Sequence, residues 1–280
     1  KEDEIIKLLE AGNITMPSNS SLIKGASSLF GVRADMQFGK LKLQTVVSQK
    51  NSTTSSVSSK GGTQLTPFDI DVANYEENRH FFLSQFFRDN YDKAMSTLPN
   101  LTTGVSISRL EIWVTNKTGT TSNTRNIIAL TDLGENKKIS NRLWSSSGQP
   151  ISSNSANTEY SELVNNHSAA RDIDQTTSVL DGIQGFVGGV DYEKLQNARL
   201  LNSSEYSLNS ALGYVSLKMT LQPDQVLAVA YEYTYGGVTY QVGEFASDNT
   251  STDKAIFVKS LKNTSNNPSQ GNWDLMMKNV

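Results

Sequence analysis

The sequence lacks cysteine entirely and has only two histidines, His80 and His167, among its 280 residues. Without cysteine, a disulfide framework and a thiolate metal site are both excluded. The two imidazoles could complete a zinc site only together with carboxylates. No Gly-x-Ser-x-Gly elbow, phosphate-binding Walker loop or His-Glu-x-x-His motif occurs either. We therefore expect no catalytic residues, no cofactor and no enzymatic activity.

Long apolar runs and long basic runs are also missing. No stretch approaches the ~20 apolar residues of a membrane-spanning helix, and the charged residues 1–4 do not resemble the start of a signal peptide. With a net charge of −3 and no basic run, nucleic-acid binding is not expected. These absences suit a soluble protein, a protein that meets a membrane through β-strands, or an excised piece of a longer chain. We favour the last interpretation.

Serine, threonine and asparagine are abundant instead. Hydrophobic residues make up 36% of the chain and charged residues 19%, both below the usual share in globular proteins. The residues that replace them favour turns, strand edges and solvated loops. The composition therefore suits an exposed, β-rich protein better than a cytosolic α/β enzyme, and the absence of cysteine fits a protein of the bacterial cell envelope. A chain of this length can form one large domain or two ordinary ones.

Residues 1–62 are expected to form the first of two parts. A short helix is predicted over residues 1–11, where apolar residues are followed by a glycine stop. A strand is predicted over Met36–Val47, in which apolar and polar side chains alternate and Gly39 is interpreted as a bulge. This strand has the length of a tilted membrane strand, with an ordinary strand of a soluble domain as the alternative. The Ser/Thr/Gly tract of residues 51–62 is interpreted as a loop or linker.

Residues 63–280 are expected to form an α+β domain that begins with a long amphipathic helix. The helix is predicted over Asn74–Leu98, with an asparagine cap at its start and Pro99 after its last turn. Its apolar stripe follows the i, i+3, i+4 rule and must be buried against a sheet or another helix. The expected core residues of the stripe are Leu83, Phe86, Phe87, Tyr91, Ala94, Met95 and Leu98.

A mainly antiparallel, sandwich-like sheet is expected after this helix. Strands are predicted over residues 105–115, 126–133 and 255–261 from their β-rich composition. Residues 134–180 are polar and weakly patterned, which predicts a long loop. A short helix is predicted over Asp191–Leu200, with its first residue as the cap.

The clearest hairpin spans Val226–Phe245 and turns at two adjacent glycines suited to a primed turn. This turn places Tyr233 opposite Tyr240 and Tyr231 opposite Val242 on one face of the sheet. We interpret the tyrosines Tyr231, Tyr233 and Tyr240 as core residues, because half-buried strands favour aromatic side chains. The alternative is that they form a platform on which a sugar stacks.

An acidic cluster precedes the predicted long helix and consists of Asp69, Asp71, Glu76 and Glu77. Carboxylate oxygens are the ligands that Ca²⁺ prefers, but the spacing matches no EF-hand loop. Because the helix dipole favours acids near a helix N-terminus, we interpret the cluster as structural, with a calcium site as the alternative. His80 and His167 lie in no recognisable motif, so both are expected to be packed or surface side chains.

Several stretches, in this order along the chain, resemble a known family. They are SSLIKGASSLFG, QFGKLKLQTVVSQK, ENRHFFLSQFFRDNYDKAMSTLPN, LEIWVTNKTG followed by RNIIALTDLGE, QVLAVAYEYTYGGVTYQVGEF and NWDLMMKNV. The chain resembles the SprA/Sov family of very large outer-membrane translocon proteins, which serve the type nine secretion system and gliding motility of Bacteroidetes. The similarity runs from about residue 12 to the C-terminus and is weakest over residues 134–180.

The resemblance implies a giant transmembrane β-barrel whose pore passes folded cargo from the periplasm to the cell surface. Its implied partners are the rest of the same chain, a protein at the lateral opening, a periplasmic plug and the secreted cargo. The family has no catalytic residues, so the resemblance assigns none to this chain. On this basis the chain is an insert or cap segment of a large outer-membrane protein, on its cell-surface side.

We therefore expect a non-enzymatic segment of a translocon that forms its cap, pore wall or partner-docking surface. A surface adhesin or carbohydrate-binding module is the first alternative. An envelope hydrolase, which would need convergent acids in a cleft, is the second.

Overall fold

The computed structural model describes residues 5–16, 26–48, 76–249, 251, 253–265 and 267–278. The chain divides into two compact units, residues 1–69 and residues 70–280, each of which is described by itself. The linker predicted over residues 51–62 lies outside the described residues. The predicted fold class, α+β with mainly antiparallel sheet, is confirmed.

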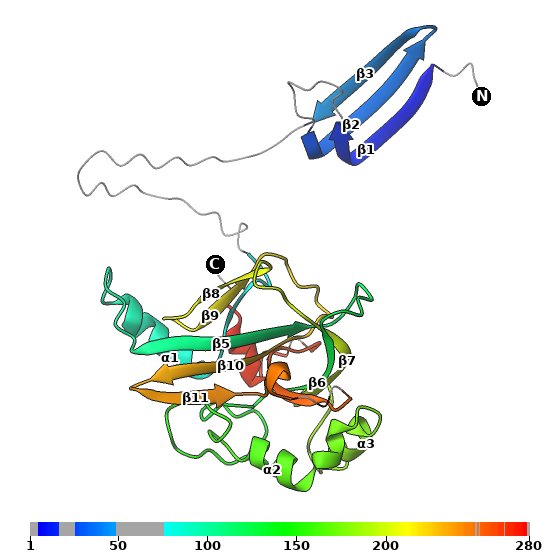
Figure 1. Cartoon of the computed structure of the whole chain (residues 1–280). Helices are drawn as coiled ribbons and strands as arrows, with labels where there is room; N and C mark the ends of the chain where they lie inside the picture. The colour runs from blue at the N-terminus through cyan, green and yellow to red at the C-terminus, as the bar shows by residue number, and fades with distance from the viewer. Residues whose placement is uncertain are drawn as a thin grey trace. The chain divides into compact units, whose positions relative to one another are not determined.

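The smaller unit is a three-stranded antiparallel sheet of β1 (Ile6–Met16), β2 (Ala26–Phe38) and β3 (Leu41–Ser48), in that order (Figure 1). The helix predicted over residues 1–11 is therefore wrong, because most of that range lies in β1. The register of β1 against β2 shifts between Ile6 and Leu8. Such an irregularity adds one residue and changes the phase of the side chains, so apolar pairs recur with a helix-like spacing.

The single strand predicted over Met36–Val47 is also wrong, because this range contains a hairpin. Phe38, the last residue of β2, pairs with Leu41, the first residue of β3. Gly39 has a φ of 60° and lies in the turn between them, not in a bulge. In a two-residue hairpin the flanking residues share one face. This explains why Phe38 is out of phase with the alternation that begins at Leu41.

The larger unit is built on strands that close into a ring. Its strands are β5 (Val105–Val114), β6 (Thr124–Leu130), β7 (Tyr192–Leu200), β10 (Leu227–Tyr235) and β12 (Ile256–Lys262). Pairing runs from β10 through β12, β6 and β7 to β5, which pairs again with β10 (Figure 1). Only the pair β6–β12 is parallel. The strands predicted over residues 105–115, 126–133 and 255–261 are confirmed.

Two hydrophobic cores lie on the two faces of this ring. The smaller core draws side chains from all five strands, including Trp113 and Ile127, and adds Phe245. The larger core lies on the other face and contains Phe87, Tyr231 and the side chains that helices and loops pack against the ring. The alternating burial along the strands follows from the period of two in a sheet.

The predicted hairpin in the last third of the chain is confirmed with its register. It consists of β10 and β11 (Val238–Val242), in which Tyr233 pairs with Tyr240 and Tyr231 with Val242. By contrast, the helix predicted over Asp191–Leu200 is wrong, because the range forms β7. The buried residues of β7 are three positions apart, which imitates a helix. Tyr192 and Leu195 are buried in the two different cores, and a register shift in the pairing with β6 separates Leu195 from Ala198.

The long helix predicted over Asn74–Leu98 is wrong, since α1 spans only Gln85–Met95. His80–Phe82 instead forms β4, which pairs with β9 (Tyr214–Leu217), and β8 (Tyr206–Asn209) completes this second sheet. The helix begins at Gln85 because its backbone N–H donates to both carboxylate oxygens of Glu135, at 3.1 and 3.2 Å. A carboxylate at a helix N-terminus satisfies free N–H groups and complements the dipole. This cap comes from a residue distant in sequence, which periodicity does not reveal.

The long loop predicted over residues 134–180 is wrong as well. The segment contains α2 (Glu159–Asn166), the 3-10 helix η2 (Ser168–Arg171) and α3 (Thr176–Leu180). Its polar side chains hold the backbone: Asn157 Nδ2 donates to the carbonyl oxygens of Asp132 and Glu135, at 2.7 and 2.8 Å. A polar segment can therefore be packed where its hydrogen bonds are internal.

The remaining described elements are two short 3-10 helices. They are η3 (Ala246–Asp248) and η4 (Gly271–Leu275). Among the described residues, no helix has the length and apolar character needed to cross a membrane.

Candidate functional site

The sheet of the smaller unit has one apolar face. In the register of β1, β2 and β3, cross-strand partners with apolar side chains come together, such as Met36 with Ile6 and Leu43. The face is formed by Ile6, Leu9, Ala11, Val32, Ala34, Met36, Phe38, Leu41, Leu43, Thr45 and Val47. Its side chains are largely uncovered, with exposed fractions of 66% for Leu9, 64% for Leu41 and 70% for Val47.

The opposite face of the same sheet carries the charges. Arg33 Nη2 lies 2.6 Å from Asp35 Oδ2, and Arg33 Nη1 lies 3.8 Å from Glu10 Oε2. The hydrogen bond from Arg33 holds the pKa of the Asp35 carboxyl below its ordinary value. Lys42 and Gln44 of β3 share this face with Arg33 and Asp35. The charged groups are thus gathered on one side, which favours contact with water there.

An antiparallel sheet normally buries its apolar face against a second layer. Among the described residues of this unit, 5–16 and 26–48, no such layer is present. The strands β1 and β2 have 11 and 13 residues, and a tilted strand needs about 9–11 residues to cross the hydrocarbon core of a bilayer. Two of the three strands have this length, and the apolar face has the chemistry to lie against lipid.

His80 lies in a chain of hydrogen bonds that the sequence did not indicate. Its Nδ1 is 2.8 Å from Ser216 Oγ, and its Nε2 is 2.7 Å from Glu76 Oε2. The bond to His80 lowers the pKa of Glu76, to which Arg79 also donates at 2.6 Å. Although serine, histidine and glutamate are the residues of a nucleophilic triad, Ser216 lies in the central strand β9 and pairs on its two sides with His80 and Ser207. Its backbone is thus engaged in the sheet and is not arranged as an oxyanion hole, so we interpret the chain as a link between β4, β9 and residues 76–79.

The acidic cluster is only partly described. Asp69 and Asp71 lie outside the described residues, Glu76 is paired with His80, and Glu77 accepts a hydrogen bond from Asn78 Nδ2 at 3.3 Å. Throughout the described part of the chain, no group of three or more histidine and acidic side chains is arranged to hold a metal ion.

The second histidine and the tyrosine ladder lie in the larger unit. His167 Nε2 is 3.9 Å from Glu162 Oε1, at the end of α2. Tyr231 and Tyr233 are fully buried in the larger core, and Tyr240 packs against it from a half-buried position. Phe87 and Phe86 of α1 meet the Tyr233 ring at centroid distances of 5.2 and 5.9 Å. These rings fill the interior and are not available as a platform for a sugar.

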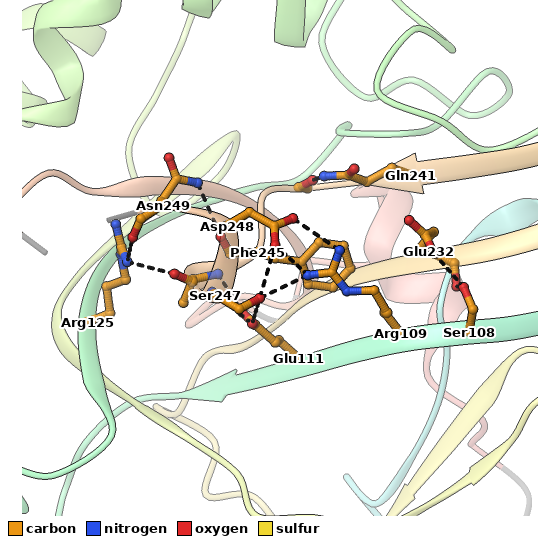
Figure 2. A network of polar contacts seen from close by, with 12 residues as sticks. Ser108, Arg109, Glu111, Arg125, Glu232, Gln241, Phe245, Ser247, Asp248 and Asn249 are labelled. Atoms are coloured by element: carbon orange, nitrogen blue, oxygen red, sulfur yellow. Dashed lines mark hydrogen bonds and ion pairs between the residues drawn. The ribbon is translucent and has the colours of Figure 1, made fainter. Parts of the chain in front are cut away.

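Figure 2 shows a polar network at one end of the strand ring, where Arg109 and Glu111 of β5 hold the segment that contains η3. Arg109 Nη2 donates to Asp248 Oδ1 at 2.7 Å, and its guanidinium carbon lies 4.0 Å from the centre of the Phe245 ring. Glu111 Oε2 accepts the Ala246 N–H at 2.8 Å. The arginine lowers the pKa of Asp248 through its hydrogen bond.

A second arginine of the network, Arg125 of β6, donates to the carbonyl oxygen of Asn249 at 2.9 Å (Figure 2). It also donates to the carbonyl oxygen of Ser251 at 2.6 Å. With Phe245 inserted into the smaller core, the segment closes this end of the ring. The sequence does not reveal the network, because its charged residues come from segments far apart in the chain, namely β5, β6 and η3. The outcome is that β5 and β6 together hold residues 246–249 over the ring.

Comparison with protein-family models matches residues 1–229 to the family SprA_N, described as motility related/secretion protein. The matched range includes the two-faced sheet and the larger unit as far as Val229 in β10. No curated protein matches the chain.

Proposed function

Because the match covers residues 1–229, the chain belongs to the SprA_N family of motility related/secretion proteins, and we propose that it is a non-enzymatic segment of an outer-membrane secretion translocon. In this proposal the sheet β1–β3 is part of the wall that crosses the outer membrane. The larger unit is a rigid insert on the cell-surface side that forms the cap, narrows the pore mouth or docks a partner.

The observation that carries the proposal is the division of the small sheet into one apolar and one polar face. Strands of outer-membrane proteins alternate between side chains that face lipid and side chains that face the interior. In β2 the apolar Val32, Ala34 and Met36 alternate with Arg33 and Asp35, whose charges pair with each other. Pairing within the polar face lowers the cost of placing these charges in a narrow interior.

The proposed partners follow from the same arrangement. In the described sheet β1 and β3 are edge strands, and unpaired strand edges recruit further strands. We assign these edges to other parts of the same long chain. The outer-membrane protein at the lateral opening, the periplasmic plug and the secreted cargo are the further partners in this proposal. The adhesin alternative gains no support, because the tyrosines that would have formed its platform, Tyr231 and Tyr233, are buried.

Spin labelling of the whole translocon protein in outer-membrane vesicles tests the proposal. The described sheet offers a matched pair of neighbours, Leu43→Cys on the apolar face and Gln44→Cys on the polar face, and the 280 residues contain no cysteine of their own. Cysteines elsewhere in the whole protein are replaced by serine. A nitroxide at position 43 should collide with dissolved oxygen more often than with a water-soluble nickel complex, and a nitroxide at position 44 should show the opposite preference. Equal, water-like accessibility at both positions would show that the apolar face is not against lipid.

A further inference from the structure

The larger unit contains a half-enclosed cavity of about 310 Å³ between α1, residues 96–105, the loop before β9 and the tip of β10. This size lies at the lower end of the range for ligand pockets, about 300–1,000 Å³. It can hold one or two side chains rather than a folded surface. Tyr231, Tyr233 and Tyr240 do not line it, whereas Tyr235 at the end of β10 does.

The floor of the cavity is apolar. Phe86, Phe87 and Ala94 of α1 and Leu212 form it, and all four are buried in the unit. The Tyr235 ring stands at the side and meets Phe86 edge-to-face at a centroid distance of 5.3 Å. A hydrophobic or aromatic side chain is the group that this floor would desolvate favourably.

The rim carries polar groups that have free hydrogen-bonding capacity. Lys93 is the sole charged residue among the described side chains that line the cavity. It is exposed, and no ion pair or hydrogen bond within the described residues engages its ammonium group. Asn90 donates its Nδ2 to the Phe86 carbonyl oxygen at 2.7 Å, which leaves its Oδ1 as a free acceptor.

Exposed apolar residues continue from the cavity onto the surface. Leu98 and Leu101 lie in the segment beside α1, and Val238 pairs with Tyr235 at the tip of the hairpin. Exposed apolar surface of this kind next to a pocket indicates a polypeptide ligand rather than a small polar molecule, because a polypeptide also contacts the surface outside the pocket.

From these observations we infer that the cavity binds the C-terminal end of a protein partner whose last residue is hydrophobic. The last side chain occupies the floor of Phe86 and Leu212, while the terminal carboxylate accepts a charge-assisted hydrogen bond from Lys93. Asn90 Oδ1 accepts the N–H of the last peptide bond. One residue at a chain end carries the apolar side chain, the N–H and the carboxylate together, and therefore satisfies the floor and both rim groups at once. The inference goes beyond the proposed function, because it does not depend on whether the small sheet crosses a membrane.

The probe is a fluorescein-labelled peptide, Ala-Ala-Leu-Phe, with its label at the N-terminus and a free C-terminal carboxylate. Its binding to the 280-residue chain is followed by fluorescence anisotropy, and its C-terminal amide is the matched control. We expect the free acid to bind and the amide to bind roughly tenfold or more weakly, the loss typical of a hydrogen bond to a charged group. Lys93→Gln should weaken the free acid to the level of the amide. Lys218→Gln, which removes an exposed lysine outside the cavity, should leave binding unchanged.

Equal binding of the acid and the amide would overturn the inference, as would unaltered binding by Lys93→Gln or the absence of binding by either peptide. A shared thermal unfolding midpoint of Lys93→Gln and the unaltered chain establishes that the variant is folded. Because the assay uses no membrane and no secretion readout, its failure and the failure of the proposed function are distinguishable.

Discussion

Gly213 lies directly against the ring of Phe87. A Cβ atom built on Gly213 would be 2.2 Å from Cδ1 and 2.3 Å from Cγ of that ring, and the glycine has a φ of +67°. The Gly213 carbonyl oxygen also accepts the Leu83 N–H at 3.0 Å. The turn between β8 and β9 is therefore shaped around the aromatic residue of α1.

Gly213→Ala should destabilise the larger unit by roughly 2–5 kcal/mol, because overpacking adds to the cost of a left-handed backbone. Urea unfolding followed by circular dichroism measures the loss. Gly236→Ala is the matched control, since Gly236 has a φ of +59° but no atom within 4 Å of its added Cβ. The control should lose only about 1 kcal/mol. Equal losses in the two variants would show that strain of the backbone, and not the Phe87 ring, determines the choice of glycine.

Phe87→Ala should destabilise the unit by about 3–5 kcal/mol, as truncations of buried aromatic side chains do. Phe87 is 3% exposed, whereas Leu98, which the sequence placed on the same helical stripe, is 55% exposed and lies outside α1. Leu98→Ala should therefore change the free energy of unfolding by less than about 0.5 kcal/mol, the usual size at a surface position. A loss below 1 kcal/mol for Phe87→Ala would show that α1 packs less tightly than its burial indicates.

The difference in burial between Phe87 and Leu98 also shows that the sequence predicts this fold only in part. The hairpin with Tyr233 opposite Tyr240 was predicted with its register, because a two-residue turn determines the pairing locally. By contrast, β1 and β7 were predicted as helices, because their apolar residues have a helix-like spacing. Register shifts in the pairing of these strands alter the phase of the side chains. Such a shift depends on the partner strand, which is not visible in a single sequence.

Part of the candidate site could be predicted from the sequence. The alternation from Leu41 to Val47 was recognised, but the turn at Gly39 and the strand β1 were missed, and the two-faced sheet needs both. The buried pair of Lys259 and Glu135, with Nζ and Oε1 2.7 Å apart, was not predictable. Its partners are far apart in the chain, and a lysine in a strand usually indicates an exposed position.

Glu159 gives a prediction on pH dependence. Its side chain is 0% exposed, and neither carboxylate oxygen has a hydrogen-bond partner within the described residues. Burial raises the pKa of Glu159 well above its ordinary value of 4.5, and the charge of Asp132 adds to this effect. The folded protein therefore keeps a proton that the unfolded chain releases above pH 4.5. As the pH rises above that value, the folded state loses up to about 1.4 kcal/mol of stability per pH unit from this group.

Glu159→Gln should remove this contribution, because glutamine does not titrate. Urea unfolding at several pH values from 4 to 8 should show a smaller decline for the variant than for the unaltered chain, with the two converging near pH 4. Burial raises the pKa values of Asp132, Glu135 and Asp191 as well, so a residual decline of the same sign remains. Glu162→Gln, on the same helix with a side chain that is 44% exposed, is the control and should follow the unaltered chain. Parallel curves for Glu159→Gln and the unaltered chain would contradict a protonated Glu159.

His80→Ala and His167→Ala test the proposed absence of chemistry in cells that secrete a cargo protein. The His80 link joins β4 to β9 through Ser216 and to Glu76, so its loss should cost stability of about 1 kcal/mol but no secretion. The measurement is the amount of cargo in the medium, relative to the amount of translocon in the outer membrane. Loss of secretion with a folded and abundant His80→Ala protein would reopen a catalytic role for the three hydrogen-bonded side chains.

The last prediction concerns the two faces of the small sheet. Leu43→Lys places a charge on the apolar face, where a lysine in contact with lipid costs about 2–4 kcal/mol at the middle of the bilayer. Gln44→Lys places the same charge on the face that already carries Arg33, Asp35 and Lys42. We therefore expect Leu43→Lys to lower the amount of translocon in the outer membrane and the cargo in the medium together, while Gln44→Lys lowers neither. If the apolar face instead packs against another protein layer, a methionine at position 43 should also disturb assembly, because shape matters there as well as polarity. Against lipid, Leu43→Met should be silent, and the two substitutions at position 43 thus separate a lipid contact from a protein contact.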